Sequence, residues 1–159
     1  MPRMTPDDRA ALVARYKAGT AAFAAAVAEV TADGDAALDR AAEGGWTGRE
    51  VVHHLADSEL TSGVRLRRLL AEDEPVIQGY DEGQFARALH YDRPVEVALR
   101  VTEAVRAASA ELLDRLTEAD WQRTGTHTES GAYGVEAWLR TYADHPYDHA
   151  DQLRRAAKS

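Results

Sequence analysis

Four stretches of the chain repeat apolar residues at the three- to four-residue spacing of an α-helix, and this pattern is the strongest constraint on the fold. They span about residues 5–30, 47–71, 94–117 and 135–155. No segment shows sustained strand alternation, and we find no internal repeat. The pattern predicts an all-α fold, a four-helix bundle. With 159 residues and 45% hydrophobic content, the whole chain, residues 1–159, has the size of a single domain.

The sequence also marks where three of these helices begin. Thr5 is a candidate N-cap, and Pro6 follows it at the first helical position, where proline is favoured because the missing N–H would be unpaired anyway. Thr47 and Glu50 have the spacing of a capping box, in which each side chain accepts a hydrogen bond from the other residue's backbone N–H. Pro94 restarts a helix before the third apolar stretch.

The apolar residues of each stretch define the face that we expect to be buried. They are Leu12, Tyr16, Phe23, Val27 and Val30 in the first stretch, Val51, Leu55, Leu66 and Leu70 in the second, Val97, Val101, Val105, Ala108, Leu112 and Leu116 in the third, and Trp138, Leu139, Tyr142 and Leu153 in the fourth. Buried tyrosines such as Tyr142, and Tyr80 outside the helices, are either core residues with one hydrogen bond or part of a pocket.

Two connections lack helical periodicity. Residues 72–93 form a long loop between the second and third helices, and we expect this segment to contain a short helix or a packed functional loop covering one end of the bundle. Gly125, Gly131 and Gly134 mark a second loop before the last helix.

Composition excludes several classes of partner and site. The formal net charge of −8 disfavours nucleic acid, and no apolar run has the roughly 20 residues of a membrane span. The N-terminus has no signal-peptide pattern, so we expect a cytoplasmic protein that acts on a small molecule. The chain has no cysteine, which excludes thiolate metal ligands and cysteine nucleophiles, and any metal must be bound through nitrogen and oxygen.

His145 and His149 lie four residues apart on the last helix, which places both imidazoles on one face. His54 falls on the inward face of the second helix, and helical bundles build metal sites from facing helices. Three neutral imidazoles would leave a coordination position open, as in catalytic zinc sites. The alternative is that the spacing arose by chance and that His54 is a hydrogen-bonded core histidine.

Pro146 lies between these two histidines. A proline inside a helix removes a backbone hydrogen bond and costs about 3 kcal/mol. Either a kink aims both imidazoles at one ion, or the helix ends before the proline and starts again after Tyr147.

Three separated segments of the chain carry a family resemblance. They are Trp46–Glu59, with the sequence WTGREVVHHLADSE, residues 75–82, with the sequence PVIQGYDE, and residues 142–149, with the sequence YADHPYDH. In this order they resemble the metal-binding helix, the loop and the last pair of ligands of the YfiT-like branch of the DinB/YfiT-like superfamily. The likeness extends from about Trp46 to Gln152.

The resemblance implies a four-helix bundle of the DinB/YfiT-like type that often forms a homodimer. It implies a divalent transition metal bound by His54, His145 and His149, with zinc or nickel favoured and manganese or iron as alternatives. Members include metal-dependent hydrolases and S-transferases that use the thiols bacillithiol or mycothiol. The chain departs from the family pattern at three residues, which bear on the substrate rather than on the metal: Pro146 in place of glycine, Asp148 in place of a frequent histidine and Phe85 in place of tryptophan.

Two further residues are candidates for catalysis. Asp57, three residues after His54, either orients that imidazole, approaches the metal centre or is a solvated surface carboxylate. His127 lies in the loop before the last helix, where it could reach a substrate. His53 and His90 are expected at the surface or in loops, and Ser58 has no identifiable base to make it a nucleophile.

Two classes of function follow from this sequence. The first is an enzyme in which the ion activates water or a thiol cosubstrate. The second is a non-catalytic module, in which the ion holds two helices together or the pocket senses a ligand.

Overall fold

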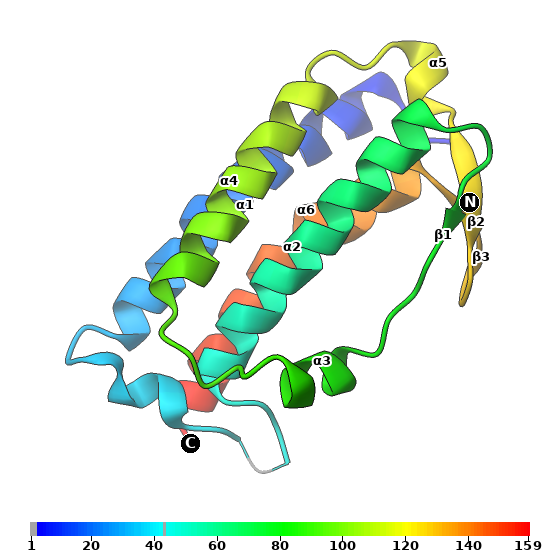
Figure 1. The fold of residues 1–159 in the computed structure, drawn as a ribbon. Helices are drawn as coiled ribbons and strands as arrows, with labels where there is room; N and C mark the ends of the chain where they lie inside the picture. The colour runs from blue at the N-terminus through cyan, green and yellow to red at the C-terminus, as the bar shows by residue number, and fades with distance from the viewer. Residues whose placement is uncertain (1–2, 43) are drawn as a thin grey trace.

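Four long helices lie side by side in the computed structural model, which describes residues 3–42 and 44–159 (Figure 1). They are α1 (Pro6–Val30), α2 (Gly48–Ala71), α4 (Glu96–Leu113) and α6 (Val135–Ala157). The predicted four-helix bundle is confirmed. α1 packs most extensively against α6, and α2 packs against both α4 and α6. None of the helices in the described part of the chain combines the length and apolar character that crossing a bilayer requires.

The predicted starts of α1 and α2 are confirmed. Thr5 caps α1, and Pro6 occupies its first helical position. At the start of α2, the Thr47 hydroxyl accepts a hydrogen bond from the Glu50 N–H at 3.1 Å, and the Glu50 carboxylate accepts one from the Thr47 N–H at 3.2 Å. This reciprocal pair satisfies two of the N–H groups that every helix leaves unpaired at its start.

The long connection between α2 and α4 contains the strand β1 (Val76–Ile77) and the short helix α3 (Glu82–Ala88). It runs along the outside of the bundle from the end of α2 to the start of α4 (Figure 1), so the prediction that it covers one end was incomplete. A 3-10 helix, η1 (Asp35–Asp39), joins α1 to α2.

The glycine-containing segment before α6 is not the irregular loop that we predicted. After the short helix α5 (Glu118–Trp121) it forms a hairpin of β2 (Thr124–His127) and β3 (Gly131–Gly134). β1 pairs in parallel with β2, which completes a three-stranded sheet in the order β1-β2-β3. Strands of two to four residues are too short to show alternation in a sequence pattern.

Buried apolar residues form two clusters at different heights along the bundle. One includes Phe23, Leu55 and Leu153, and the other includes Tyr16 and Trp138. Between the two clusters, the inward positions of the four long helices carry small or polar residues and two of the candidate metal ligands. These residues are Gly19 on α1, Ser58, Glu59 and Ser62 on α2, Thr102, Arg106 and Ser109 on α4, and His145, Pro146 and His149 on α6. We call this set the middle layer.

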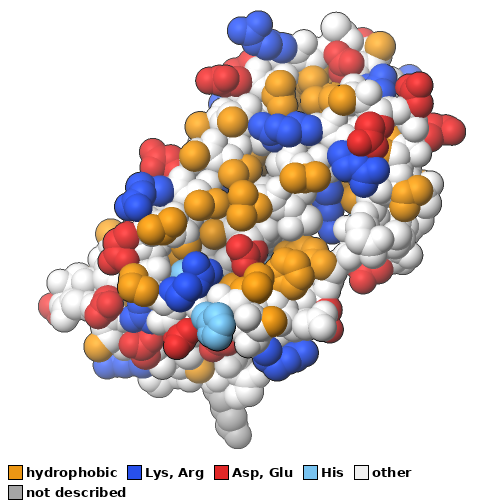
Figure 2. Space-filling model, in the orientation of Figure 1, with side chains coloured by type: hydrophobic (Ala, Val, Ile, Leu, Met, Phe, Trp, Pro, Cys, Tyr) orange, Lys and Arg blue, Asp and Glu red, His pale blue; other side chains and the backbone are white. Residues whose placement is uncertain are grey.

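The predicted inward faces of α1, α2 and α6 are largely correct, but that of α4 is wrong. The core-facing residues of α4 are Ala98, Thr102, Arg106, Ser109 and Leu113, one position after most of the valines and leucines that we expected. A one-residue offset corresponds to a rotation of about 100° around the helix axis. Val97 is 58% exposed, and apolar side chains gather on the face formed by α2 and α4 (Figure 2). Apolar periodicity misidentified the face because the core contains an arginine.

Removing the Thr47 hydroxyl should weaken the start of the helix that carries His54. We expect Thr47→Ala to lower the free energy of unfolding by about 1 kcal/mol, measured by urea denaturation, because an N–H of the first turn loses its acceptor. The matched control is Thr141→Ala on the exposed face of α6, for which a change within about 0.5 kcal/mol is expected. Equal losses in the two variants would contradict a specific capping role.

Candidate metal centre

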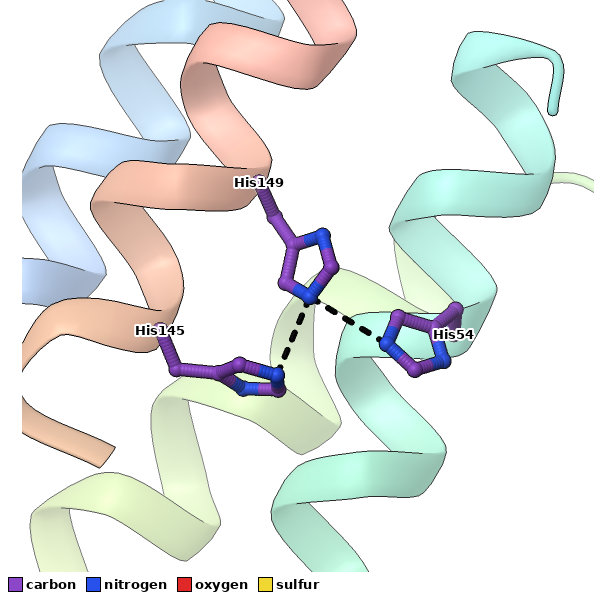
Figure 3. A group of neighbouring side chains, drawn as sticks. All are labelled: His54, His145 and His149. Atoms are coloured by element: carbon purple, nitrogen blue, oxygen red, sulfur yellow. Dashed lines mark hydrogen bonds between the residues drawn. The ribbon is translucent and has the colours of Figure 1, made fainter. Parts of the chain in front are cut away.

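Three histidine side chains meet between α2 and α6. His54 comes from α2, and His145 and His149 come from successive turns of α6 (Figure 3). Nε2 of His149 lies 3.0 Å from Nε2 of His145 and 3.2 Å from Nε2 of His54. One nitrogen from each ring lies within 4.8 Å of the other two. The structure therefore brings together the three residues that the sequence suggested.

These separations fit a shared ion. Two nitrogen ligands at 2.0–2.1 Å from one tetrahedral zinc lie about 3.3 Å apart. Nδ1 of His149 is 2.8 Å from the amide oxygen of Gln152, and since that oxygen only accepts, Nδ1 carries the hydrogen and Nε2 presents a lone pair to the other rings. The donor set of three imidazoles suits zinc, nickel, manganese or iron. Among the described residues, no carboxylate or fourth histidine joins the cluster, so coordination positions are left for other ligands.

Burial keeps these imidazoles uncharged. It lowers the pKa of His54 to about 3, with a further contribution from His149. Burial likewise lowers the pKa of His145 to about 2, followed by the effects of His149, His54 and Arg106. The pKa of His149 is also lowered by burial, against an opposing hydrogen bond to Gln152. The neutral imidazole is the form that binds a metal.

Two residues around the cluster orient its rings. The ring of Trp46 lies edge-on to His54, with centroids 4.8 Å apart. Gln152 holds the ring of His149 through Nδ1, the kind of contact that fixes which nitrogen faces a metal. Gln152 was not among the predicted site residues, although its position three residues after His149 places it on the same helical face.

α6 continues through Pro146 without interruption, so the alternative of a helix that stops and starts again is wrong. Proline has no N–H to donate to the carbonyl oxygen of Tyr142 four residues earlier. Nη1 of Arg106 donates to that oxygen instead, at 3.0 Å. Pro146 packs beside Gly19 of α1, where an added Cβ would lie only 2.8 Å from Cγ of the proline.

Asp57 does not orient His54. Its Oδ2 accepts a hydrogen bond from the hydroxyl of Tyr91 at 2.7 Å, and Nδ1 of His54 has no partner among the described residues. Burial, followed by the hydrogen bond to Asp57, raises the pKa of Tyr91, so this hydroxyl remains a donor. Asp57 is partly exposed on the α2 turn that follows His54.

His127 lies on β2 and is buried rather than placed in an exposed loop. Its Nδ1 accepts a hydrogen bond from the Glu129 N–H at 3.2 Å, and its ring lies against Tyr133 with centroids 5.5 Å apart. Burial, and then the charge of Arg65, lower the pKa of His127. This histidine is not part of the three-histidine cluster.

The remaining histidines differ from each other. His90 is exposed, as predicted. The prediction that His53 lies at the surface was wrong, since it is buried and its Nε2 lies 2.8 Å from the carbonyl oxygen of Arg93. Adjacent residues on a helix point about 100° apart, so His53 faces Arg93 in the segment before α4, while His54 faces α6.

Tyr80 and Tyr142 lie in the same region of the structure, next to Arg65. Nη1 of Arg65 donates to the Tyr142 hydroxyl at 3.1 Å, and the guanidinium lies 6.0 Å from the centre of the Tyr80 ring. The Tyr142 ring is also 5.5 Å from that of His145. Tyr142 is therefore a core residue whose hydroxyl accepts one hydrogen bond, as the first interpretation predicted, and its ring borders the histidine cluster.

Known proteins are similar to this chain in sequence and in fold. The sequence profile of the DinB superfamily matches residues 15–153. A protein from Oceanobacillus iheyensis named "Putative metal-dependent hydrolase" is 37% identical over 115 residues, which are 72% of this chain and 67% of that protein. A protein given the same name from Halalkalibacterium halodurans is 31% identical over 114 residues, with the same two shares of 72% and 67%.

Among solved structures, YfiT from Bacillus subtilis matches with a TM-score of 0.89 and 27% identity, covering 99% of this chain and 91% of that one. It is described as a probable metal-dependent hydrolase with an unusual four-helix bundle topology. The fold and these matches define the class of protein: a helical bundle similar to proteins named putative or probable metal-dependent hydrolases. The chain belongs to the DinB superfamily, as its three sequence segments predicted.

Removing one histidine of the cluster tests whether it holds an ion. We expect untagged His145→Ala to lose the equivalent of metal that the unmodified protein binds, measured by elemental analysis after dialysis, because two imidazoles rarely hold an ion against water. The control is His90→Asn, an exposed histidine with a φ of 53°, a backbone conformation that asparagine tolerates. A full equivalent in His145→Ala would exclude the site.

Proposed function

We propose that the chain binds one divalent transition metal through His54, His145 and His149 and uses it to hydrolyse a small-molecule substrate. The observation that carries this proposal is the convergence of three Nε2 atoms on one point, with separations of 3.0 and 3.2 Å from His149. The names of the relatives in Oceanobacillus and Halalkalibacterium and the description of YfiT as a probable metal-dependent hydrolase support the same activity.

When bound, such an ion lowers the pKa of a water molecule or thiol so that a nucleophile forms near neutral pH. The protein's part is to supply neutral donors and to limit the number of ligands. Gln152 fixes the tautomer of His149, and Trp46 covers one edge of the His54 ring. The absence of cysteine from the chain means that a thiol nucleophile would have to come from a cosubstrate.

We assign the role of proton acceptor to Asp57. The hydrogen bond from Tyr91 to Oδ2 holds this carboxylate in one orientation and leaves Oδ1 to accept a proton. For His127 we propose a role in contacting the substrate, because Nδ1 already accepts the Glu129 N–H and the neutral ring then carries its hydrogen on Nε2. That nitrogen donates to a substrate but does not accept a proton from it.

A second candidate function is a thiol-dependent S-transferase that uses bacillithiol or mycothiol. The same open coordination would accept a thiolate, so the two enzymes differ in the nucleophile rather than in the protein ligands. A non-catalytic module remains the third outcome, in which the ion only links α2 to α6.

One assay separates these three functions. The metal-free protein, restored with one equivalent of zinc or nickel, is incubated with a panel of ester, amide and phosphoester substrates, and separately with small thiols and a generic electrophile. We expect hydrolysis that disappears on chelation and returns with the metal. Metal-dependent consumption of thiol would select the transferase, and a stoichiometric metal without turnover in either assay would select the module.

The role of Asp57 has its own test. We expect Asp57→Asn to lower kcat by about 100-fold or more with little change in metal content, since a positioned general base contributes a factor of about 10² to 10⁴. Asp151→Asn is the control, because Asp151 is an exposed acid near the end of α6 that pairs with Arg154. An unchanged kcat in Asp57→Asn would remove this residue from the mechanism.

A further inference from the structure

Pro146, between the two ligands of α6, leaves the carbonyl oxygen of Tyr142 without its helical donor. This oxygen lies in the interior of the bundle, where an unpaired carbonyl is costly. The donor that replaces the missing N–H comes from another helix, since Nη1 of Arg106 on α4 lies 3.0 Å from the Tyr142 oxygen. The backbone between His145 and His149 is therefore completed by a side chain of α4.

The same guanidinium contacts two further helices. Nη1 of Arg106 donates to Oε1 of Glu59 on α2 at 2.6 Å, and Nη2 donates to the carbonyl oxygen of Tyr16 on α1 at 2.6 Å. The guanidinium also stacks over the Tyr16 ring, 3.8 Å from its centre. Arg106 is thus bonded to all three other long helices of the bundle, and its side chain is 2% exposed, against 0% for Glu59.

Glu59 connects this arginine to the helix that carries His54. Burial raises the pKa of Glu59, while Arg106 opposes that effect by favouring the charged carboxylate. The Ser62 hydroxyl donates to the second carboxylate oxygen at 3.1 Å, so both oxygens have donors. Glu59 lies five residues after His54 on the same rigid helix, so fixing Glu59 also fixes the position of His54 along the bundle axis.

Gly19 of α1 makes room for this arrangement. A Cβ built on Gly19 would lie 2.9 Å from Nη2 of Arg106 and 2.8 Å from Cγ of Pro146. The absence of a side chain lets the arginine and the proline approach the backbone of α1 together. Gly19 therefore leaves the room that Arg106 and Pro146 occupy beside α1.

We infer that Arg106 is a positioning residue of the metal centre, which holds α6 at the Tyr142 carbonyl in register with α2 at Glu59 so that His145 and His149 meet His54. This inference rests on the proposed metal binding. Arg106 acts through the backbone of α6 and the carboxylate of Glu59. A buried ion pair is by itself weak evidence for stability, but it can specify one arrangement of helices among several.

The inference predicts that the effect of Arg106 on metal binding depends on Pro146. In Pro146→Ala, the new N–H supplies the Tyr142 carbonyl from within the helix, and the arginine is no longer its necessary donor. The test measures cobalt(II) affinity and the cobalt absorption spectrum of four untagged proteins: the unmodified chain, Arg106→Lys, Pro146→Ala and the double variant. Lysine keeps a positive charge beside Glu59 but lacks the planar fork that reaches several acceptors.

We expect Arg106→Lys to weaken cobalt binding at least tenfold and to alter its absorption spectrum, which reports ligand geometry. Pro146→Ala should bind within threefold of the unmodified protein. The double variant should lose less affinity relative to Pro146→Ala than Arg106→Lys loses relative to the unmodified protein, because only the contact with Glu59 is still altered. Equal loss in both backgrounds would overturn the route through Tyr142, and no loss in Arg106→Lys would overturn the positioning role.

A matched control separates positioning from general stability. Arg9→Lys alters another buried arginine, which pairs with Glu118 at 2.8 Å and with Glu136 at 3.6 Å and contacts none of the three histidines. We expect it to lower the urea midpoint of the metal-free protein while cobalt affinity stays within twofold. A loss of affinity as large as that of Arg106→Lys would show that both effects are merely structural.

The experiment also distinguishes a variant that does not fold from a protein that does not bind metal. If Arg106→Lys does not fold, the fallback is Glu59→Met combined with Arg106→Met, which removes both charges and leaves the Tyr142 carbonyl without its partner. The cobalt affinity of this variant is then compared with and without Pro146→Ala. If the unmodified protein binds less than one equivalent of cobalt, the proposed metal centre fails. If it binds a full equivalent and Arg106→Lys binds equally tightly, only the role of Arg106 fails.

Discussion

The structure depends on one buried ion pair, Arg106 with Glu59, in the middle layer of the bundle. The two apolar clusters, one on each side of this layer, would by themselves allow each helix several rotations about its axis and several positions along it. The ion pair of Arg106 with Glu59, at 2.6 Å, favours the arrangement in which the two Nη atoms also reach the carbonyl oxygens of Tyr142 and Tyr16. The three histidines lie in or beside this layer, so their meeting point is set by the same constraint.

The three histidines of the cluster are carried by α2 and α6. A site built on two long helices is more rigid than one built on loops, because each helix fixes several side chains at once. The capping box at Thr47 sets where α2 begins, and the contact of Arg106 with Tyr142 completes α6 at its proline. The α3 and β1 segments lie outside these helices (Figure 1).

Much of the fold could be predicted from local signals, and the parts that could not depend on contacts between distant residues. Helical spacing and the Thr47 cap identified α1, α2 and α6, and the separation of His145 from His149 by one turn identified half of the site. The rotation of α4 could not be predicted from its valines, because Arg106 faces the core through partners that are distant in sequence, among them Glu59, 47 residues earlier in the chain. The small sheet was missed because β1 pairs with a hairpin about 50 residues away. The burial of His53 likewise depends on a distant neighbour, Arg93, whereas the contact of Gln152 with His149 is local and was open to prediction from the three-residue spacing.

The distance in sequence between His54 and His149 has a consequence for how the chain folds. A ligand shared by these two side chains would close a loop of 95 residues that contains α3, α4, α5 and the sheet but leaves α1 outside. Loop closure reduces the entropy of the unfolded ensemble, so such a ligand would act as a reversible cross-link as well as a chemical centre. Its release would loosen the enclosed segments together, whereas α1 lies outside the loop and would keep its packing against α6 and α4.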